Sequence, residues 1–353
     1  MKRTKVLVCP DKFRHCADSI WLTQTIGNQV LQNGFEAIEL PLSDGGEGFL
    51  SVYGSALGAK YRSKLVSNAL GRPIEARWAI ASSSNARGSK TAIIEMALAC
   101  GLEVIGGASA NRPLDSSTRG VGQLILEAIA NSAKRIVVGC GGSATTDGGL
   151  GALEALRPFH KLKGIELICA CDVKTKFTKA AEEFAGQKGA TRGEIAFLKR
   201  RLERLLKEYN REFGVDLSDL EMAGAAGGLA GGLAAIGSKL VSGIDLIMES
   251  CRFEELLLSA DLVITGEGLL DESSYDGKVV GKVLELAKRY DKPVLVVVGA
   301  VDQDMNIERE GADIVDIVCI PRADDEPTNS ESFGSAVQLE VRRWLDTSKA
   351  KSI

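Results

Sequence analysis

Short apolar runs rich in β-branched residues alternate along this 353-residue chain with segments of helical periodicity. Such alternation is typical of an α/β protein with a parallel sheet, and continuous apolar runs are expected where helices cover both faces of the sheet. The sequence therefore predicts the α/β class. The predicted strands are residues 5–9, 37–40, 136–139, 166–170, 262–265, 294–299 and 314–319.

Three helices are predicted from periodicity and end signals. One begins at residue 18 or 19 and ends at Gly34, where glycine suits a helix C-terminus. A second lies between Gly46 and Gly58. The third covers residues 192–213, where apolar side chains recur at helical spacing.

The predicted strands near the two chain ends can form one sheet. Five of them fit the flavodoxin-like order 2-1-3-4-5, in which ligands bind at the carboxyl ends of the strands. Residues 1–60 and 255–353 would then form a discontinuous flavodoxin/Rossmann-like parallel-sheet domain, and residues 61–254 an inserted second α/β domain. No glycine- or serine-rich linker marks either join.

Composition excludes several classes of protein. The chain has 43 Lys and Arg against 47 Asp and Glu, a formal net charge of −4, which disfavours a general binder of nucleic-acid backbones. The longest uncharged stretch, residues 222–238, is shorter than the roughly 20 residues of a membrane span and contains six glycines. We therefore expect neither a nucleic-acid partner nor a membrane partner.

The cysteines and the N-terminus bear on compartment. Eight cysteines form no CxxC and the chain has only two histidines, which disfavours a zinc cluster. The first apolar run ends at Pro10 and is too short for a signal peptide. These features predict a reducing, cytoplasmic location.

Four segments that directly follow predicted strands carry acidic or hydroxyl residues, mostly with glycines. A tight turn alone does not require acidic residues, so their repetition favours one site where the carboxyl ends of the strands converge. The four segments are residues 11–14, 43–48, 139–149 and 265–271, the last followed by Asp276, Gly277 and Lys278.

Residues 139–149 combine backbone N–H groups with the hydroxyls of Ser143, Thr145 and Thr146, and a helix is expected to follow. Backbone amides and helix N-termini favour anions, so this segment predicts a phosphate cradle. A tight strand-to-helix turn without a ligand is the alternative.

Six carboxylates near these strand ends supply the hard oxygen ligands that Mg²⁺ prefers. Mg²⁺ usually takes only one or two of them together with substrate phosphates, so the others would orient water, cap a helix or accept a proton. Lys12, Arg14 and Lys278 could neutralise phosphate charge, although each alone is more often a surface cation. The six carboxylates are Asp44, Glu47, Asp147, Asp172, Glu267 and Asp271.

Common nucleotide-binding motifs are absent or match loosely. No GxxxxGK[ST] P-loop occurs, and neither HRD nor DFG is present. Residues 139–144 match the Rossmann GxGxxG/A pattern, but the acidic residue expected about 20 positions later is missing, since Asp172 follows Gly139 by 33 residues. This loose match is the only support for a nicotinamide cofactor.

A glycine-rich segment covers residues 221–237. On a helix, Gly224, Gly228 and Gly232 would form a flat stripe that another backbone or a ligand can approach closely. Two roles for this stripe stay open: close packing of helices, or a position beside the ligand.

Seven segments of the chain form an ordered set: residues 10–14 (PDKFR), 41–48 (PLSDGGEG), 94–97 (IEMA), 136–149 (IVVGCGGSATTDGG), 170–173 (ACDV), 223–229 (AGAAGGL) and 263–268 (VITGEG). In this order they resemble the bacterial glycerate kinases of the non-P-loop, two-domain type. The resemblance extends from residue 6 to about residue 301.

The resemblance implies ATP-dependent phosphorylation of D-glycerate in the cytoplasm with Mg²⁺, with 2-phosphoglycerate favoured over 3-phosphoglycerate as product. It also implies a site in the cleft between the two domains. The chain departs from the family pattern at His15-Cys16, where the family usually has Gly-Ser/Thr, and at Leu269, where an Arg is common.

The sequence thus predicts a glycerate kinase. Asp44 or Asp172 would orient the glycerate hydroxyl and accept its proton, with Lys12 as a further catalytic residue, and Glu267 and Asp271 are the predicted metal ligands. The predicted substrate- and phosphate-binding residues are Arg14, Gly45, Gly46, Glu47, Gly141, Gly142, Ser143, Thr145, Thr146, Asp147 and Lys278.

Two rival functions are kept. The loose Rossmann match would suit an NAD-dependent oxidoreductase acting on a hydroxy acid. The departures at residues 15, 16 and 269 would suit a catalytically inactive relative that binds small molecules. A homodimer is left open.

Overall fold

A computed structural model describes residues 3–13, 16–82, 89–275, 278–302, 314–320 and 328–347. The chain divides into two compact units, residues 1–44 with 247–353, and residues 45–246. The sequence placed the joins at 60/61 and 254/255. Residues 45–60, which include the helix α2 (Phe49–Ala56), belong to the second unit.

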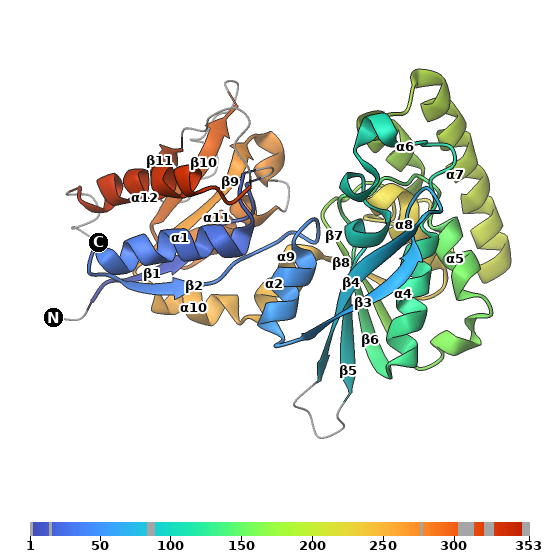
Figure 1. Ribbon diagram of the computed structural model, residues 1–353, viewed down its shortest axis with the longest axis horizontal. Helices are drawn as coiled ribbons and strands as arrows, with labels where there is room; N and C mark the ends of the chain where they lie inside the picture. The colour runs from blue at the N-terminus through green and yellow to red at the C-terminus, as the bar shows by residue number, and fades with distance from the viewer. Residues whose placement is uncertain are drawn as a thin grey trace. The chain divides into compact units, whose positions relative to one another are not determined.

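The first unit contains a five-stranded parallel sheet (Figure 1). Its order, β11-β10-β9-β1-β2, is the 2-1-3-4-5 order that the sequence predicted. The predicted fold class is therefore confirmed for this unit. The strands are β1 (Lys5–Val8), β2 (Glu36–Glu39), β9 (Leu262–Leu270), β10 (Val294–Val301) and β11 (Ile314–Cys319).

Helices pack against this sheet and bury its apolar strands. α1 (Ser19–Gln32) and α12 (Glu331–Leu345) lie side by side and share a core with β1, β9 and β10 (Figure 1). α1 begins where predicted, because the Asp18 side chain accepts a hydrogen bond from the Trp21 N–H. α10 (Phe253–Ser259) packs against β1, and α11 (Val279–Arg289) packs against β9.

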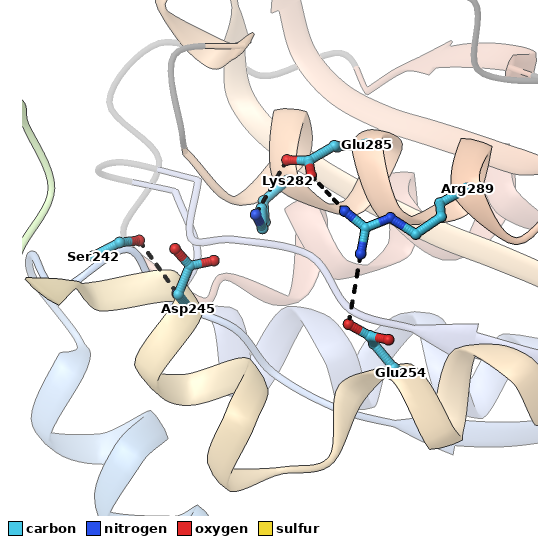
Figure 2. A network of polar contacts seen from close by, with 6 residues as sticks. All are labelled: Ser242, Asp245, Glu254, Lys282, Glu285 and Arg289. Carbon is cyan, nitrogen blue, oxygen red and sulfur yellow. Dashed lines mark hydrogen bonds and ion pairs between the residues drawn. The ribbon is translucent and has the colours of Figure 1, made fainter.

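Ion pairs at the surface link α11 to α10 (Figure 2). Glu285 Oε2 lies 3.1 Å from Lys282 Nζ, and Glu285 Oε1 lies 3.1 Å from Arg289 Nη2. Arg289 Nη1 then lies 3.9 Å from Glu254 Oε1. Exposed pairs of this kind contribute at most about 1 kcal/mol, so the stability of the unit depends on its apolar core.

The second unit contains a six-stranded mixed sheet of order β3-β4-β5-β6-β7-β8. β3, β4 and β5 are antiparallel, whereas β5 to β8 are parallel. Sequence patterns predicted only β6 and β7 and missed the other four strands, of which β3 is exposed and polar and β8 is short. The strands are β3 (Lys60–Ser67), β4 (Pro73–Ser82), β5 (Lys90–Glu95), β6 (Ala133–Gly139), β7 (Glu166–Cys171) and β8 (Lys239–Ser242).

The longest helix of this unit, α7 (Arg192–Phe213), has the predicted bounds, because Thr191 and Glu194 form a capping box at its start. No helix in the described residues is long and apolar enough to cross a membrane. The other α-helices after α2 are α3 (Ala97–Cys100), α4 (Arg119–Ala130), α5 (Leu150–Leu156), α6 (Ala180–Phe184), α8 (Ala225–Ala235) and α9 (Gly243–Ser250). Short 3₁₀ turns cover Glu103–Ile105, Ala108–Ala110, Phe159–Leu162, Phe177–Lys179, Gly186–Lys188 and Glu272–Tyr275.

The glycine-rich segment differs from its prediction. α8 is interrupted by left-handed backbone angles at Ala226, Gly227 and Gly228. Gly224, Gly228 and Gly232 therefore do not line one face of a regular helix, and the predicted stripe is wrong. Glycine tolerates positive φ, which permits the interruption.

The small residues of this segment instead admit a neighbouring backbone. A Cβ built on Gly227 would lie 1.9 Å from the carbonyl oxygen of Thr145. The Gly148 N–H donates a hydrogen bond of 3.0 Å to the Gly227 carbonyl. A Cβ on Gly232 would likewise lie 2.5 Å from the Gly148 carbonyl oxygen. The segment thus fixes residues 145–149, part of the predicted phosphate cradle.

We expect Gly227→Ala to lower the free energy of unfolding by about 1–3 kcal/mol, because the new Cβ would clash with the Thr145 carbonyl at a backbone conformation of φ +66°. Urea denaturation followed by circular dichroism measures the change. Gly193→Ala is the matched control: it lies in α7 with no atom within 4 Å of its Cβ, and we expect the same stability or slightly more. A wild-type midpoint for Gly227→Ala would contradict the packing described here.

Candidate active site

Buried carboxylates gather at the carboxyl ends of the strands in the first unit. Asp11 follows β1 and is 7% exposed, Asp44 follows β2 and is 9% exposed, and Glu267 lies in β9 and is 8% exposed. The Asp11 N–H donates to the Gly266 carbonyl at 2.9 Å, which ties the end of β1 to β9. Lys12 Nζ lies 3.8 Å from Asp44 Oδ1. We call Asp11, Lys12, Asp44 and Glu267 the strand-end cluster.

Burial raises the pKa values of two members of this cluster. The pKa of Asp11 rises to about 6 through loss of hydration, and the neighbouring Lys12 charge opposes the rise. The pKa of Glu267 rises to about 7, also because of burial, with Asp11 adding to the rise and Lys278 opposing it. The buried Oε1 of Glu267 has no hydrogen-bond partner among the described residues. An acceptor left in this state favours a cation or a donor from a ligand.

Two further predicted residues lie near the cluster. Asp271 is half-buried and caps the turn Glu272–Tyr275, since its Oδ1 accepts the Ser274 N–H at 3.2 Å. Lys278 precedes α11 and acts electrostatically on both Asp11 and Glu267. Within the described ranges no group of three or more His, Cys, Asp or Glu is arranged to hold a metal ion.

Arg14 and His15 lie outside the described residues, so the predicted binding role of Arg14 stays a prediction. The other departures from the family pattern fall on described positions. Cys16 is half-buried, and Leu269 is 50% exposed at the end of β9.

In the second unit, four of the predicted residues lie together around the end of β6. A Cβ built on Gly141 would lie 2.4 Å from Gly46 Cα and 3.0 Å from Asp172 Oδ2. Gly45 has φ +105°, and a Cβ there would lie 2.9 Å from the Ala170 carbonyl oxygen. Only glycine permits these approaches, so Gly45, Gly46 and Gly141 bring two backbone loops against Asp172. The predicted Glu47 and Gly142 are exposed.

Glu95 holds the loop that contains Gly45 and Gly46. This buried carboxylate at the end of β5 accepts hydrogen bonds from the N–H groups of Gly48 at 3.1 Å and Leu50 at 2.9 Å. It therefore caps the start of α2. The sequence alone indicated no role for Glu95, because an acidic residue at a strand end does not by itself show which amides it faces.

Asp147 holds the other loop. Its carboxylate accepts four hydrogen bonds, from the N–H and hydroxyl of Thr118, both at 2.8 Å, and from the N–H groups of Gly149 and Gly151, both at 3.1 Å. These bonds use both carboxylate oxygens. Asp147 thus anchors residues 145–149 to the starts of α4 and α5.

A buried lysine that the strand-end pattern did not reveal contacts this loop. Lys188, 4% exposed, donates from Nζ to Ser143 Oγ at 2.7 Å and to the Thr145 carbonyl at 2.8 Å. Thr145 Oγ1 and Thr146 Oγ1 are buried and have no hydrogen-bond partner in the parts of the chain described here. Lys188 follows no strand, so the strand-end pattern that found the other candidates passed over it.

These arrangements suit phosphoryl transfer. The second unit presents glycine-bounded backbone, hydroxyl groups and an ammonium, which bind oxyanions. Each unit also presents an aspartate that can accept a proton or orient a hydroxyl, Asp44 in the first unit and Asp172 in the second.

Proteins similar to this chain are also phosphoryl-transfer enzymes. The sequence profile of the glycerate kinase family matches residues 6–159 and 157–334. A glycerate 2-kinase of Escherichia coli K12 is 32% identical over 346 residues, which cover 88% of this chain and 89% of the relative. A glycerate kinase of Bacillus subtilis 168 is 32% identical over 336 residues, 86% of each protein. A crystal structure of a glycerate kinase 2 candidate from Salmonella typhimurium LT2 matches with a TM-score of 0.79 and 29% identity over 99% of this chain and 98% of that chain.

The two-sheet α/β fold and these matches define a small-molecule kinase. The chain belongs to the glycerate kinase family. This confirms the resemblance stated from the sequence and the prediction of a kinase.

The raised pKa of Glu267 predicts a pH dependence of stability. The folded state keeps the proton up to about pH 7, whereas an unfolded Glu loses it near pH 4.5, so stability falls as the pH rises between these values. At pH 8, Glu267→Gln should therefore be more stable than the wild type, by up to roughly 3 kcal/mol, with little difference at pH 4.5.

Thermal unfolding across this pH range measures the effect. Glu249→Gln, at an exposed position on α9, is the control and should follow the wild-type curve. Equal stabilities of Glu267→Gln and the wild type at pH 8 would show that the buried charge carries no cost.

Proposed function

We propose that this protein transfers the γ-phosphoryl group of ATP to a hydroxyl of D-glycerate with Mg²⁺, and that it forms 2-phosphoglycerate in preference to 3-phosphoglycerate. The observation that carries the proposal is the family match over nearly the whole chain, in which an Escherichia coli relative is named a glycerate 2-kinase. The buried hydroxyls and glycine-bounded loop of the second unit support it, because both substrates are anions.

Phosphoryl transfer needs alignment and charge stabilisation more than covalent help from the protein. We assign to Asp44 or Asp172 the orientation of the glycerate hydroxyl and the acceptance of its proton. Asp172 lies against Gly141 and is half-buried, whereas Asp44 pairs with Lys12. Lys12, Arg14 and Lys278 would pair with anionic oxygens.

The loop of residues 141–147 would hold a phosphate or the glycerate carboxylate. Ser143, Thr145 and Thr146 supply hydroxyl donors, and Asp147 keeps the loop in place through its four hydrogen bonds. The remaining proposed binding residues are Gly141 and Gly142, at the start of this loop, and Gly45, Gly46 and Glu47, in the segment whose Gly46 lies against Gly141.

A divalent cation fits the first unit. Glu267 presents a buried carboxylate oxygen that has no partner within the described ranges. Asp271, just past the end of β9, adds a half-buried carboxylate that acts electrostatically on Glu267, and both are hard ligands of the kind that Mg²⁺ prefers. When bound, Mg²⁺ would neutralise phosphate charge.

The eight cysteines are all free thiols, which supports a reducing cytoplasmic location.

The test is a coupled assay of ADP formation with D-glycerate, with L-glycerate and without acceptor. We expect ADP only when D-glycerate is present, and a 2-phosphate ester in the phosphorus NMR spectrum of the product. Saturable binding of ATP and D-glycerate without ADP would favour an inactive relative. A D-glycerate-dependent change in nicotinamide absorbance without ADP would favour an oxidoreductase.

We expect either Asp44→Asn or Asp172→Asn to lower kcat by about 10²–10⁴-fold, because an amide cannot accept the hydroxyl proton. Steady-state kinetics with both substrates measures the loss and identifies the base. Asp219→Asn is the control, since its side chain is 90% exposed and pairs only at the surface with Lys176. A wild-type kcat in both Asp44→Asn and Asp172→Asn would show that neither residue is the general base.

A further inference from the structure

Lys188 carries a buried ammonium whose two hydrogen-bond partners are neutral. Its Nζ donates to the Ser143 hydroxyl and to the Thr145 carbonyl. The carboxylates of Asp172 and Asp147 act on it electrostatically, but neither is a hydrogen-bond partner among the described residues. A buried charge without an ion-pair partner is costly, so the Lys188 ammonium destabilises the folded state.

The donors around Lys188 are incompletely used. A lysine ammonium has three N–H donors, and the structure gives partners to two of them. Thr145 Oγ1 and Thr146 Oγ1 add two buried hydroxyls that have no hydrogen-bond partner among the described residues, and Thr145 is the residue whose carbonyl Lys188 contacts. In the described part of the chain, one loop thus carries buried hydroxyls without hydrogen-bond partners and contacts a buried cation without an ion pair. This combination matches an oxyanion, which accepts several hydrogen bonds and supplies the missing charge.

We propose that Lys188 is a substrate-binding residue of this kinase, whose ammonium contacts an oxyanion held by the hydroxyls of Thr145 and Thr146. The inference rests on the proposed function for the identity of the oxyanion, which is either the carboxylate of glycerate or a phosphate of the nucleotide. Both present the same chemistry to the site: two or three oxygens that share negative charge.

A purely structural role would not need the charge. The bonds to Ser143 and to the Thr145 carbonyl could be made by a neutral amide without the cost of burying an ammonium. Burial lowers the pKa of Lys188 to about 8, and the charges of Asp172 and Asp147 oppose this shift only in part. A bound oxyanion would raise this pKa again.

The first test is Lys188→Gln, which removes the charge and keeps hydrogen-bond donors. Calorimetry without turnover measures the binding of D-glycerate and of ADP separately. We expect the affinity for one of them to fall by about 10–100-fold, the loss typical of a charged hydrogen bond. A loss confined to D-glycerate assigns the carboxylate, and a loss confined to ADP assigns the phosphate.

Lys179→Gln is the matched control. It removes a lysine charge from the same unit at a side chain that is 57% exposed and pairs with Glu182, and we expect wild-type affinities. The thermal midpoint of each variant shows whether it is folded. Wild-type affinity of Lys188→Gln for both ligands would overturn the proposal.

A second test measures proton uptake by the wild-type protein when the ligand binds. At pH 8 about half of the Lys188 side chains are unprotonated, so oxyanion binding should take up to about half a proton, and at pH 6.5 almost none from this group. Calorimetry in two buffers of different ionisation enthalpy measures the uptake. Asp11 and Glu267, whose pKa values lie near 6 and 7, could also take up protons at these pH values, so the share of Lys188 is the part of the uptake that is lost in Lys188→Gln.

The failure of this inference is distinguishable from failure of the proposed function. If no ADP forms from D-glycerate but inorganic phosphate binds with proton uptake at pH 8, the proposed reaction fails and the oxyanion site stands. If ADP forms normally but no ligand causes proton uptake at pH 8, the proposed role of Lys188 is wrong and the proposed reaction stands.

Discussion

The carboxylate of Asp147 fixes the loop on which the candidate site of the second unit depends. Its four hydrogen bonds join residues 147–151 to Thr118, so the loop after β6 cannot relax away from α4 and α5. Gly227 packs directly on the Thr145 carbonyl from the other side. With its backbone held in this way, the loop keeps the hydroxyls of Thr145 and Thr146 buried, with no hydrogen-bond partner in the described part of the chain, a cost that a ligand can offset.

The first unit carries a cost of a different kind. Its parallel sheet places Asp11, Asp44 and Glu267 at the carboxyl ends of β1, β2 and β9, where burial raises the pKa values of Asp11 and Glu267. Lys12 compensates only in part. Natural proteins tolerate such groups mostly at functional sites, because a ligand or metal repays their desolvation. Among the described residues, each unit thus buries polar side-chain atoms that have no hydrogen-bond partner: the acceptor Glu267 Oε1 in the first unit, and the hydroxyls of Thr145 and Thr146 in the second.

Local sequence signals account for the regular elements. The limits of α7 follow from a capping box and a helical apolar stripe, and the sheet order of the first unit follows from five apolar runs and the parallel-sheet rules. β3 escaped prediction because it is an edge strand with polar, exposed side chains, so no apolar run marks it. The glycine stripe was mispredicted because helical spacing does not reveal that three successive residues adopt left-handed angles to meet another backbone.

By itself the sequence determined the α/β class, the order of one sheet, the glycerate kinase family and most of the polar residues at strand ends, because these depend on periodicity and on short ordered motifs. Only the tertiary structure decided what those residues contact. In the folded protein Asp147 accepts hydrogen bonds from backbone amides, and Lys188, 45 positions along the chain, contacts Ser143. Thr145, Thr146 and Glu267 each bury a polar atom that has no partner among the residues described here. Burial and hydrogen-bond partners depend on segments distant in the chain, and no local pattern encodes them.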